Sequence, residues 1–345
     1  MDSKLLTVVV PVYKVEPYIH KCLDSLILPN PLMERLEVLA VDDGTPDRSA
    51  EMAEEYVKKY PGTFRIIHKE NGGHGSAWNR GLAEATGKYI RFLDSDDWYS
   101  TGDFGRLMEK LQQMDVDVVI SNYNRYFVQR DEFEPMRGVA LEEGIIYNAD
   151  DMDWTKQPWE VTYFWRCTYR TAMLQAEQPL FLERVFYDDT KLFFASAMLA
   201  RSVCYLDLTI YNYLLGREGQ TMTAENQKKH YLNKYTVQKD IFDFYLSHPV
   251  TGEARNRFLN KQINFWLFDQ FYQLSRFPYR ERKRLLKEWR AYYHRLAGKT
   301  GFKKAGYGMM RCYLCLPYPL YYGISRLKDL LTGRKGRPDH VSWGQ

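Results

Sequence analysis

Residues 88–100 have the sequence KYIRFLDSDDWYS, and this stretch says most about the fold. An apolar run ends abruptly in Asp94, Ser95, Asp96 and Asp97, a concentration of negative charge that a protein core does not accept unpaired. The pattern predicts a buried strand that delivers carboxylates to the edge of a sheet. An Asp-x-Asp pair offers the oxygen ligands that Mg²⁺ or Mn²⁺ prefers, with room for substrate phosphates. A strand that merely ends in an acidic turn is the alternative.

The composition is that of a globular protein. Of the 345 residues, 45% are hydrophobic and 27% are charged, which excludes a disordered chain and fits one large or two modest domains. The mean hydropathy is too low for a protein that spans a membrane several times. The first apolar stretch is short and leads directly into patterned sequence, so we expect no signal peptide.

The cysteines and the charges indicate a compartment and a partner. Five cysteines form an odd, scattered set, which favours a reducing cytoplasm over a disulfide scaffold. The single CxxC pair, Cys312 and Cys315, lacks the further ligands that a zinc site needs. Residues 276–345 contain 17 Lys and Arg against 4 Asp and Glu, a balance of +13 in a chain whose net charge is +4. A basic C-terminal segment on an acidic body indicates an anionic partner surface.

Strand and helix patterns alternate over the first part of the chain. Short apolar runs predict strands at residues 7–11, 37–41, 64–68, 89–93 and 117–121. Apolar residues at helical spacing predict helices from residue 17 and over 47–60, 76–85 and 104–114. This alternation is typical of a mostly parallel α/β sheet covered on both faces, which binds ligands beyond the carboxyl ends of its strands.

The rest of the chain changes character twice. Residues 125–215 are less regular and rich in aromatic side chains, with a helix expected over 191–200 and a strand over 205–213. Helices are expected over 226–247, 252–275 and 280–296, before an apolar segment at 307–324. We therefore expect an α/β domain at residues 1–223 and a helical C-terminal region at 224–345.

Three motifs follow one another in the first domain. They are VVVPVYKVEPYIHKCLDSL from residue 8, VLAVDDGTPDRS from residue 38 and KENGGHGSAWNRGLAEATGKYIRFLDSDDW from residue 69. With these motifs the chain resembles the catalytic domain of the family 2 glycosyltransferases, over residues 5–100 and more weakly to 223. The resemblance implies the GT-A fold, a nucleotide-sugar donor, and an inverting transfer in a single displacement helped by Mn²⁺ or Mg²⁺.

The resemblance assigns roles to the first two strand exits. Pro11, Tyr13 and Glu16 match the loop that borders the nucleotide base in the family. Asp42 and Asp43 match the carboxylates near the base and the ribose. Carboxylates form charge-assisted hydrogen bonds with ribose hydroxyls, which are stronger than neutral ones.

Two further motifs are implied to hold the rest of the donor. Asn71, Gly72 and Gly73 match the loop that closes on the nucleotide, where glycine permits a close backbone approach. Asp94 and Asp96 match the family's DxD motif. There the last Asp usually holds the metal on the diphosphate, and the first lies near the ribose or the metal.

The acceptor hydroxyl must lose its proton, which requires a general base on the face opposite the diphosphate. The sequence YDDT at 187–190 resembles the family's Glu-Asp segment. Asp189 aligns with the family's base, and Asp188 stands where Glu is usual. The substitution shortens the reach of the side chain, so the choice between the two Asp residues stays open. Either could instead only cap the helix that follows.

Other matches are weaker, and two positions depart from the family pattern. Arg217 falls in YNYLLGREGQTMT, which resembles a later family stretch, and either meets the diphosphate or is a solvated surface residue. Trp165 in FWRCTYRTAML is the candidate acceptor-side residue, with core packing as the alternative for its aromatic neighbours. Trp78 replaces a frequent Arg. His74 replaces a frequent Leu and either binds phosphate or sugar or is a satisfied loop histidine.

The C-terminal segment indicates contact with a membrane surface. Residues 280–295 combine Leu, Trp and Tyr with many cations, and 307–324 is too short an uncharged run to span a bilayer. This pattern favours an interfacial anchor on anionic lipid, with a packed helical tail as the alternative. We expect no nucleic-acid partner, because no binding module accompanies the charge.

We therefore predict a cytoplasmic enzyme, peripheral at the inner face of the plasma membrane. It is expected to transfer a sugar from a nucleotide sugar, by family habit a UDP-sugar, to a glycan or lipid-linked acceptor in cell-surface polysaccharide biosynthesis. The first strand is not followed by the Gly-rich phosphate loop of a sugar-phosphate nucleotidyltransferase. Gly73-His74-Gly75 also lacks the third glycine of a dinucleotide-binding motif. The remaining alternative is a non-catalytic GT-A-like protein that binds nucleotide sugar or glycan.

Overall fold

The computed structural model describes residues 4–217, 230–274, 277, 279–300 and 308–331. The chain forms two compact units, one of residues 1–237 and 250–256 and the other of residues 238–249 and 257–345. The expected domain boundary after residue 223 lies outside the described residues and stays a prediction.

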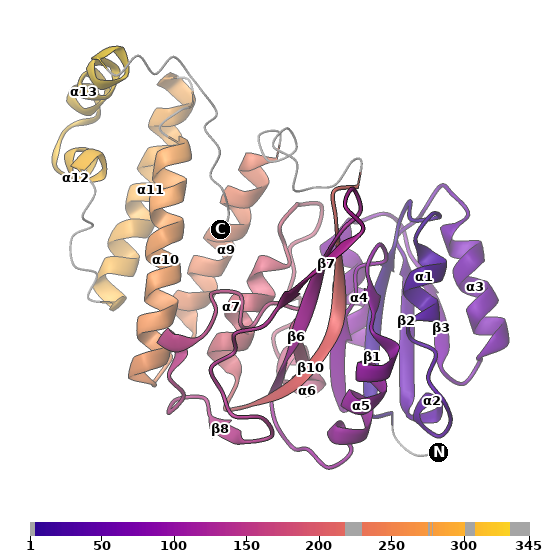
Figure 1. The fold of residues 1–345 in the computed structure, drawn as a ribbon. Coiled ribbons are helices and arrows are strands. Elements are labelled where there is room, and N and C mark those ends of the chain that lie inside the picture. The colour runs from indigo at the N-terminus through magenta and orange to yellow at the C-terminus, as the bar shows by residue number, and fades with distance from the viewer. Residues whose placement is uncertain (1–3, 218–229, 275–276, 278, 301–307, 332–345) are drawn as a thin grey trace. The chain divides into compact units, whose positions relative to one another are not determined.

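The first half of the sheet in the first unit is parallel (Figure 1). The strands β3 (Phe64–His68), β2 (Leu36–Asp42), β1 (Leu6–Val12) and β4 (Tyr89–Phe92) lie side by side in this order. The chain moves outward from β1 to β3 and then returns to β4. Right-handed crossovers therefore place α1 (Ile19–Asp24) and α3 (Ser49–Lys59) on one face and α4 (His74–Glu84) on the other. The predicted parallel α/β alternation is confirmed here.

The second half of the sheet is mixed. The short strand β9 (Cys167–Arg170) runs antiparallel between β4 and β6 (Val118–Phe127), and β10 (Ser202–Leu215) runs parallel to β6. On the far side of β10, β5 (Trp98–Tyr99) pairs antiparallel with it. The hairpin partner β7 (Glu132–Met136) and the edge strand β8 (Ile146–Asn148) complete the sheet. Strands of two to five residues show too little alternation to be recognised in a sequence.

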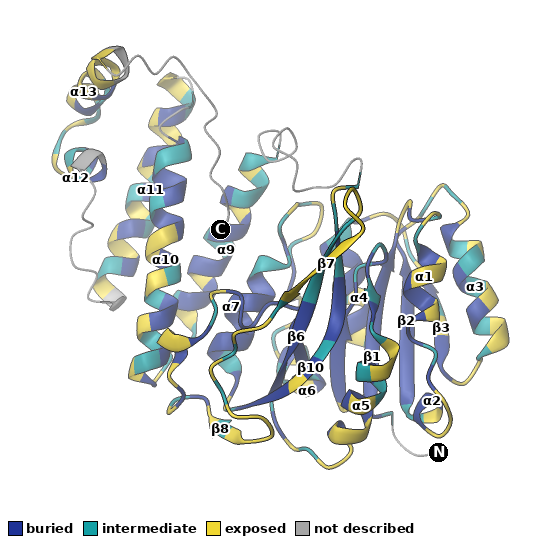
Figure 2. Cartoon of the chain, viewed as in Figure 1, coloured by how far each residue is buried: buried dark blue, intermediate teal, exposed yellow. Residues whose placement is uncertain are grey.

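The remaining helices of this unit cover the sheet or connect its strands. They are α2 (Leu32–Arg35), α5 (Thr101–Leu111), α6 (Thr171–Gln175), α7 (Thr190–Leu199) and the 3-10 helix η1 (Trp154–Lys156). Every residue of β1 and β2 is buried, which gives the dark blue centre of the sheet in Figure 2. Burial on both faces explains the continuous apolar sequence of these strands.

Helices make up the second unit. It contains α11 (Tyr279–Thr300), α12 (Gly308–Cys315), α13 (Tyr318–Leu331) and most of α9 (Tyr231–Ser247) and α10 (Glu253–Leu274). The apolar residues of α11 face inward: Leu286 and Trp289 are fully buried, and the Trp289 indole donates a hydrogen bond of 2.9 Å to the Leu267 carbonyl. Residues 280–296 are therefore a helix packed by its apolar face within this unit.

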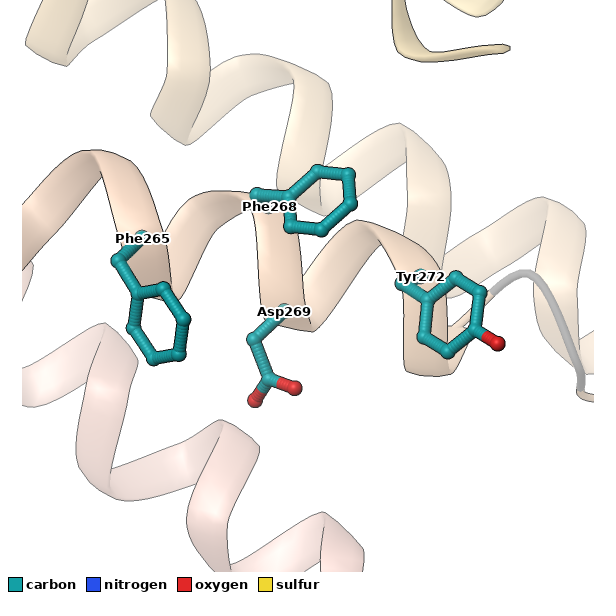
Figure 3. Close-up of a pocket in the computed structure, with 4 residues that line it drawn as sticks. All are labelled: Phe265, Phe268, Asp269 and Tyr272. Carbon is teal, nitrogen blue, oxygen red and sulfur yellow. The ribbon is translucent and has the colours of Figure 1, made fainter. Parts of the chain in front are cut away.

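Two observations concern membrane insertion and a candidate ligand pocket. None of the described helices is both long enough and apolar enough to cross a bilayer. On α10, a small pocket of about 160 Å³ is lined by Phe265, Phe268, Asp269 and Tyr272, and Figure 3 shows the carboxylate of Asp269 between the rings of Phe265 and Tyr272.

Candidate active site

The acidic motif lies opposite the end of β10 because of one short strand pairing. β5 follows the motif directly and pairs with β10, with Tyr99 opposite Tyr211 and Trp98 opposite Asn212. This register brings Asp94, Asp96 and Asp97 next to the last residues of β10 and to Arg217 just beyond it.

Asp97 is fixed within the protein. The Tyr211 hydroxyl donates a hydrogen bond of 2.5 Å to one of its carboxylate oxygens, and the Leu214 N–H donates one of 2.7 Å to the other. Its side chain is buried, and this burial, with repulsion from Asp96 and Asp94, holds the pKa of Asp97 well above its usual range. Both oxygens have protein partners, so Asp97 acts as a structural anchor.

Asp94 and Asp96 present carboxylate oxygens to a common space. One oxygen from each acid of the motif, Asp97 included, lies within 4.8 Å of the others. Burial and the charge of Asp94 raise the pKa of Asp96, although Arg217, whose Nε donates to Asp96 at 2.5 Å, opposes the shift. Carboxylates that repel one another are stabilised by a cation, and hard oxygen donors suit a small divalent ion. Arg217 is thus not a solvated surface residue.

His74 connects the acidic motif to the candidate base segment. Its Nε2 lies 3.0 Å from an oxygen of Asp94, and its Nδ1 lies 3.0 Å from an oxygen of Asp188. Burial disfavours protonation, but Asp188 and then Asp94 outweigh it, so the pKa of His74 lies well above its usual range. The histidine is satisfied, as one sequence alternative had it, but its partners are two residues of the candidate site.

The segment that carries Asp188 and Asp189 is fastened to the start of α4. The Asn79 side chain makes two hydrogen bonds with the backbone of Phe181, of 2.8 and 3.0 Å, and the Arg184 N–H donates to the Gly72 carbonyl at 2.8 Å. Gly75 allows the close approach, because a Cβ there would lie 2.2 Å from the Leu182 carbonyl oxygen and 2.9 Å from the Asp188 carboxylate.

The environment of Asp189 raises its pKa. Burial, followed by repulsion from Asp188, raises the pKa of Asp189 to about 7, against the opposing charge of His74. Asp189 is the N-cap residue of α7, but its side chain makes no capping hydrogen bond. The residue before the pair, Tyr187, has a φ of 71°, a left-handed conformation that non-glycine residues adopt at a cost and that often accompanies functional sites.

Asp43 holds the glycine loop in place. One carboxylate oxygen accepts from the Gly72 N–H at 2.9 Å and from the Lys69 ammonium at 2.6 Å, and the other accepts from the Gly73 N–H at 2.8 Å. The Asn71 side chain donates to the Asp43 carbonyl at 2.9 Å. The φ of Gly73 is +86°, which favours glycine. Asp43 therefore shapes the loop through both of its oxygens.

The exits of β1 and β2 meet beside this loop. Asp42 accepts a hydrogen bond of 2.8 Å from the Thr45 N–H and lies 2.8 Å from Nδ1 of His68. Pro11 is buried in β1, whereas Tyr13 is 41% exposed just beyond it. Glu16 accepts from the backbone N–H of Arg48 at 3.3 Å, which ties the two exit loops together.

Trp165 belongs to an aromatic stack next to the acids. Its ring is nearly parallel to that of Tyr213, at 10° and 5.6 Å, and stacks on Tyr163 at 4.6 Å. The buried indole N–H of Trp165 has no hydrogen-bond partner among the described residues. Burial and the charges of Asp97, Asp94, Asp189 and Asp96 raise the pKa of Tyr213 well above its usual range. The charges of both groups of acids therefore act on the hydroxyl of Tyr213.

Tyr211 and Tyr213 are candidate site residues that the sequence analysis did not single out. A signal existed, because residues two apart on a strand face the same side of the sheet. Trp78 is fully buried next to His74, and its ring centroid lies 4.2 Å from that of the imidazole and 4.6 Å from that of Phe92. A side chain in this position supports the site from within the core, whereas the Arg common in the family would carry a charge there.

Comparison with known proteins identifies the family. The sequence-family model described as "Glycosyl transferase family 2" matches residues 7–176 of this chain. The uncharacterized glycosyltransferase EpsJ of Bacillus subtilis (strain 168) is 35% identical over 259 residues, covering 73% of this chain and 72% of that protein. The chain belongs to the family 2 glycosyltransferases and is a glycosyltransferase enzyme.

Solved structures establish the fold. S. aureus TarS 1–349, crystallised with UDP-GlcNAc, has a TM-score of 0.68 at 19% identity, covering 98% of this chain and 95% of that one. The mannosyltransferase PcManGT from Pyrobaculum calidifontis, in complex with GDP-Man and Mn²⁺, has a TM-score of 0.53 at 15% identity, covering 97% and 89%. The predicted GT-A class is confirmed.

Proposed function

We propose that this glycosyltransferase carries out an inverting, divalent-metal-dependent transfer from a nucleotide sugar, a UDP-sugar, to a hydroxyl of a glycan or lipid-linked acceptor in cell-surface polysaccharide biosynthesis. The observation that carries the proposal is the His74 bridge, because one imidazole joins Asp94 of the acidic motif to Asp188 of the base segment. The acids that hold the metal at the diphosphate and the base that takes the acceptor proton act on the same sugar, so they must lie about one sugar ring apart. The His74 bridge supports this arrangement, because it joins the two groups of acids.

A nucleotide-sugar donor is supported by the ligands of the similar structures, UDP-GlcNAc in one and GDP-Man in the other. In our proposal the β1 and β2 exits and the glycine loop contact the nucleotide. The contributing residues are Pro11, Tyr13, Glu16, Asp42, Asp43, Asn71, Gly72 and Gly73. Asp43 acts by holding the loop rather than by binding ribose, because its oxygens are already occupied by the loop and Lys69.

Asp94 and Asp96 are the proposed ligands of Mn²⁺ or Mg²⁺. Their oxygens lie close enough for one ion, and burial together with the charge of Asp94 raises the pKa of Asp96, a strain that a cation would relieve. When bound, the cation supplies positive charge to the diphosphate that leaves with the nucleotide. Arg217, held at Asp96, contributes a fixed positive charge on the same side.

Asp189 is the proposed general base, and Asp188 positions it. Asp188 is engaged by His74, which leaves Asp189 as the carboxylate of the pair that the imidazole does not engage. A base with a pKa of about 7 is about half ionised at neutral pH, and in its ionised form it can accept the proton of the acceptor hydroxyl. Attack from the side opposite the diphosphate inverts the anomeric centre.

Trp165 is the proposed acceptor-side contact. With Tyr163 and Tyr213 it forms an aromatic stack next to the acids, and aromatic rings suit the C–H faces of a saccharide. A cytoplasmic position at the inner face of the plasma membrane is supported by the cysteines, all five of which are free thiols. We propose that the protein does not bind nucleic acid.

A thermal-shift screen of nucleotide sugars with Mn²⁺ tests donor and metal together, since a ligand that binds the folded state raises Tm. We expect UDP-sugars to raise Tm only when Mn²⁺ or Mg²⁺ is present. Donor hydrolysis, followed with Mn²⁺ and then with EDTA, separates an active enzyme from a non-catalytic binding protein. NMR of the transferred sugar reports the anomeric configuration, and retention would refute the inverting mechanism.

A further inference from the structure

Helix α13 is attached to the second unit by one of its faces. Tyr321 is fully buried, and its ring lies 5.0 Å from Tyr313 and 5.9 Å from Phe271. Ser325, one turn further on, is also buried. Contacts on this face fix the orientation of the helix, so side chains on its other faces are held outward.

An apolar stripe runs along the outward side. It consists of Leu320, Ile324, Leu327 and Leu331, which are 59%, 42%, 58% and 79% exposed. The spacing of four, three and four residues puts all of them on one side of the helix over three turns. Figure 2 shows exposed residues at intervals along α13. Single exposed aliphatic residues are ordinary, but an aligned row of large ones marks an interaction surface.

The charge around the stripe selects among partners. Arg326 and Lys328 lie on either side of Leu327 in the sequence, and both are exposed. They belong to the segment 276–345, whose balance is +13. A second copy of the chain would bring two such positive segments together, whereas a surface of anionic lipid attracts them.

The more basic helix is not suited to this contact. Residues 280–295 contain many cations, but their large apolar residues, including Leu286 and Trp289, are buried within the unit, and of the large apolar residues of α11 Tyr279 at its start is exposed. Insertion into a lipid interface needs exposed apolar side chains as well as charge. Among the described residues of the basic segment, the α13 stripe provides the aligned row of exposed aliphatic side chains.

We propose that the stripe Leu320–Ile324–Leu327–Leu331 binds the surface of an anionic bilayer, with α13 lying in the interface plane. The aliphatic side chains enter the boundary between headgroups and acyl chains, and Arg326 and Lys328 remain at the level of the lipid phosphates. This inference does not depend on the donor, the metal or the base proposed above.

Sedimentation of the full chain with vesicles tests the proposal, using phosphatidylglycerol mixed with phosphatidylcholine and phosphatidylcholine alone. The wild-type chain should bind only the anionic vesicles, less strongly at high salt. The double variant Leu320→Asn/Leu327→Asn should bind about tenfold more weakly or worse. Both side chains are more than half exposed, so Tm should hardly change.

Matched controls separate the stripe from general surface polarity. Val128→Asn/Ile146→Asn removes two exposed aliphatic residues of the first unit, which are 46% and 51% exposed, and should leave vesicle binding unchanged. Arg326→Gln should weaken binding about fivefold at low salt and less at high salt.

Three results would overturn the inference. Wild-type protein that ignores anionic vesicles refutes it, and so does a Leu320→Asn/Leu327→Asn variant that binds as well as wild type. A dimer in solution that dissociates on the same substitutions would identify the stripe as a self-association surface instead. Donor hydrolysis serves as an independent check, because it should be unaffected by these substitutions.

Discussion

The replacement Asp189→Asn probes the proposed base by its pH dependence. Burial and Asp188 raise the pKa of Asp189 to about 7, so transfer by the wild-type enzyme should rise with pH up to that value and level off above it. At pH 5 only about 1% of such a group is ionised, which predicts a rate about a hundredfold below the plateau. An Asp with an ordinary pKa would give a nearly flat profile from pH 5 to 8.

Asparagine keeps the size of the side chain but cannot take a proton. Transfer at pH 8 should fall by about 10²–10⁴, while donor affinity, measured by thermal shift or calorimetry, stays close to that of wild type. The assay is release of the nucleotide in the presence of acceptor, measured from pH 5 to 8.5. A flat wild-type profile would refute the assignment of Asp189. Loss of transfer with Asp188→Asn but not with Asp189→Asn would assign the base to the neighbouring residue.

Stability gives a readout that does not depend on activity. The pKa of Asp189 is higher in the folded protein than in the unfolded chain, so its contribution to stability is present at low pH and is lost as the pH rises toward 7. Asp189→Asn should therefore raise Tm at pH 8 and raise it less at pH 5. Asp153→Asn is the matched control, since Asp153 is also an N-cap residue but does cap its helix. It should show no such pH-dependent gain.

Further substitutions test the rest of the site. Asp96→Ala should abolish the stimulation by Mn²⁺ without lowering Tm, and a variant that still responds to Mn²⁺ would exclude Asp96 as a ligand. His74→Leu removes the charge that opposes the raised pKa of Asp189, so the midpoint of the pH–rate profile should move upward; an unchanged midpoint would contradict the bridge. Gly73→Ala should cost about 1–3 kcal/mol, measured by urea unfolding, because φ is +86° there, and an equally stable variant would contradict the strain argument. Trp78→Ala should cost about 3–5 kcal/mol, because the ring is fully buried, and a smaller loss would mean that the site collapses around the cavity.

Much of the first half of the fold could be read from the sequence. The strands of the parallel half are buried on both faces, and their apolar runs therefore stand out without alignment or structure. The same holds for the residues at their exits, since the carboxyl ends of parallel strands meet on one edge. For Arg217 the sequence left two interpretations open, a site residue or a solvated surface residue. Its pairing with Asp96 joins residues 121 positions apart and could not be read from local sequence.

Local pattern determined that Asp94, Asp96 and Asp189 are acids at the ends of buried elements, since apolar periodicity is a property of neighbouring residues. Only the tertiary structure decided that His74 joins Asp94 to Asp188, that Asp97 is an anchor and that Asp43 holds a loop. These relations depend on the pairing of β5 with β10 and on the docking of residues 181–189 against α4. Hydrogen bonds between residues about 20 to 115 positions apart leave no periodic trace in a sequence, because their geometry exists only once the chain has folded.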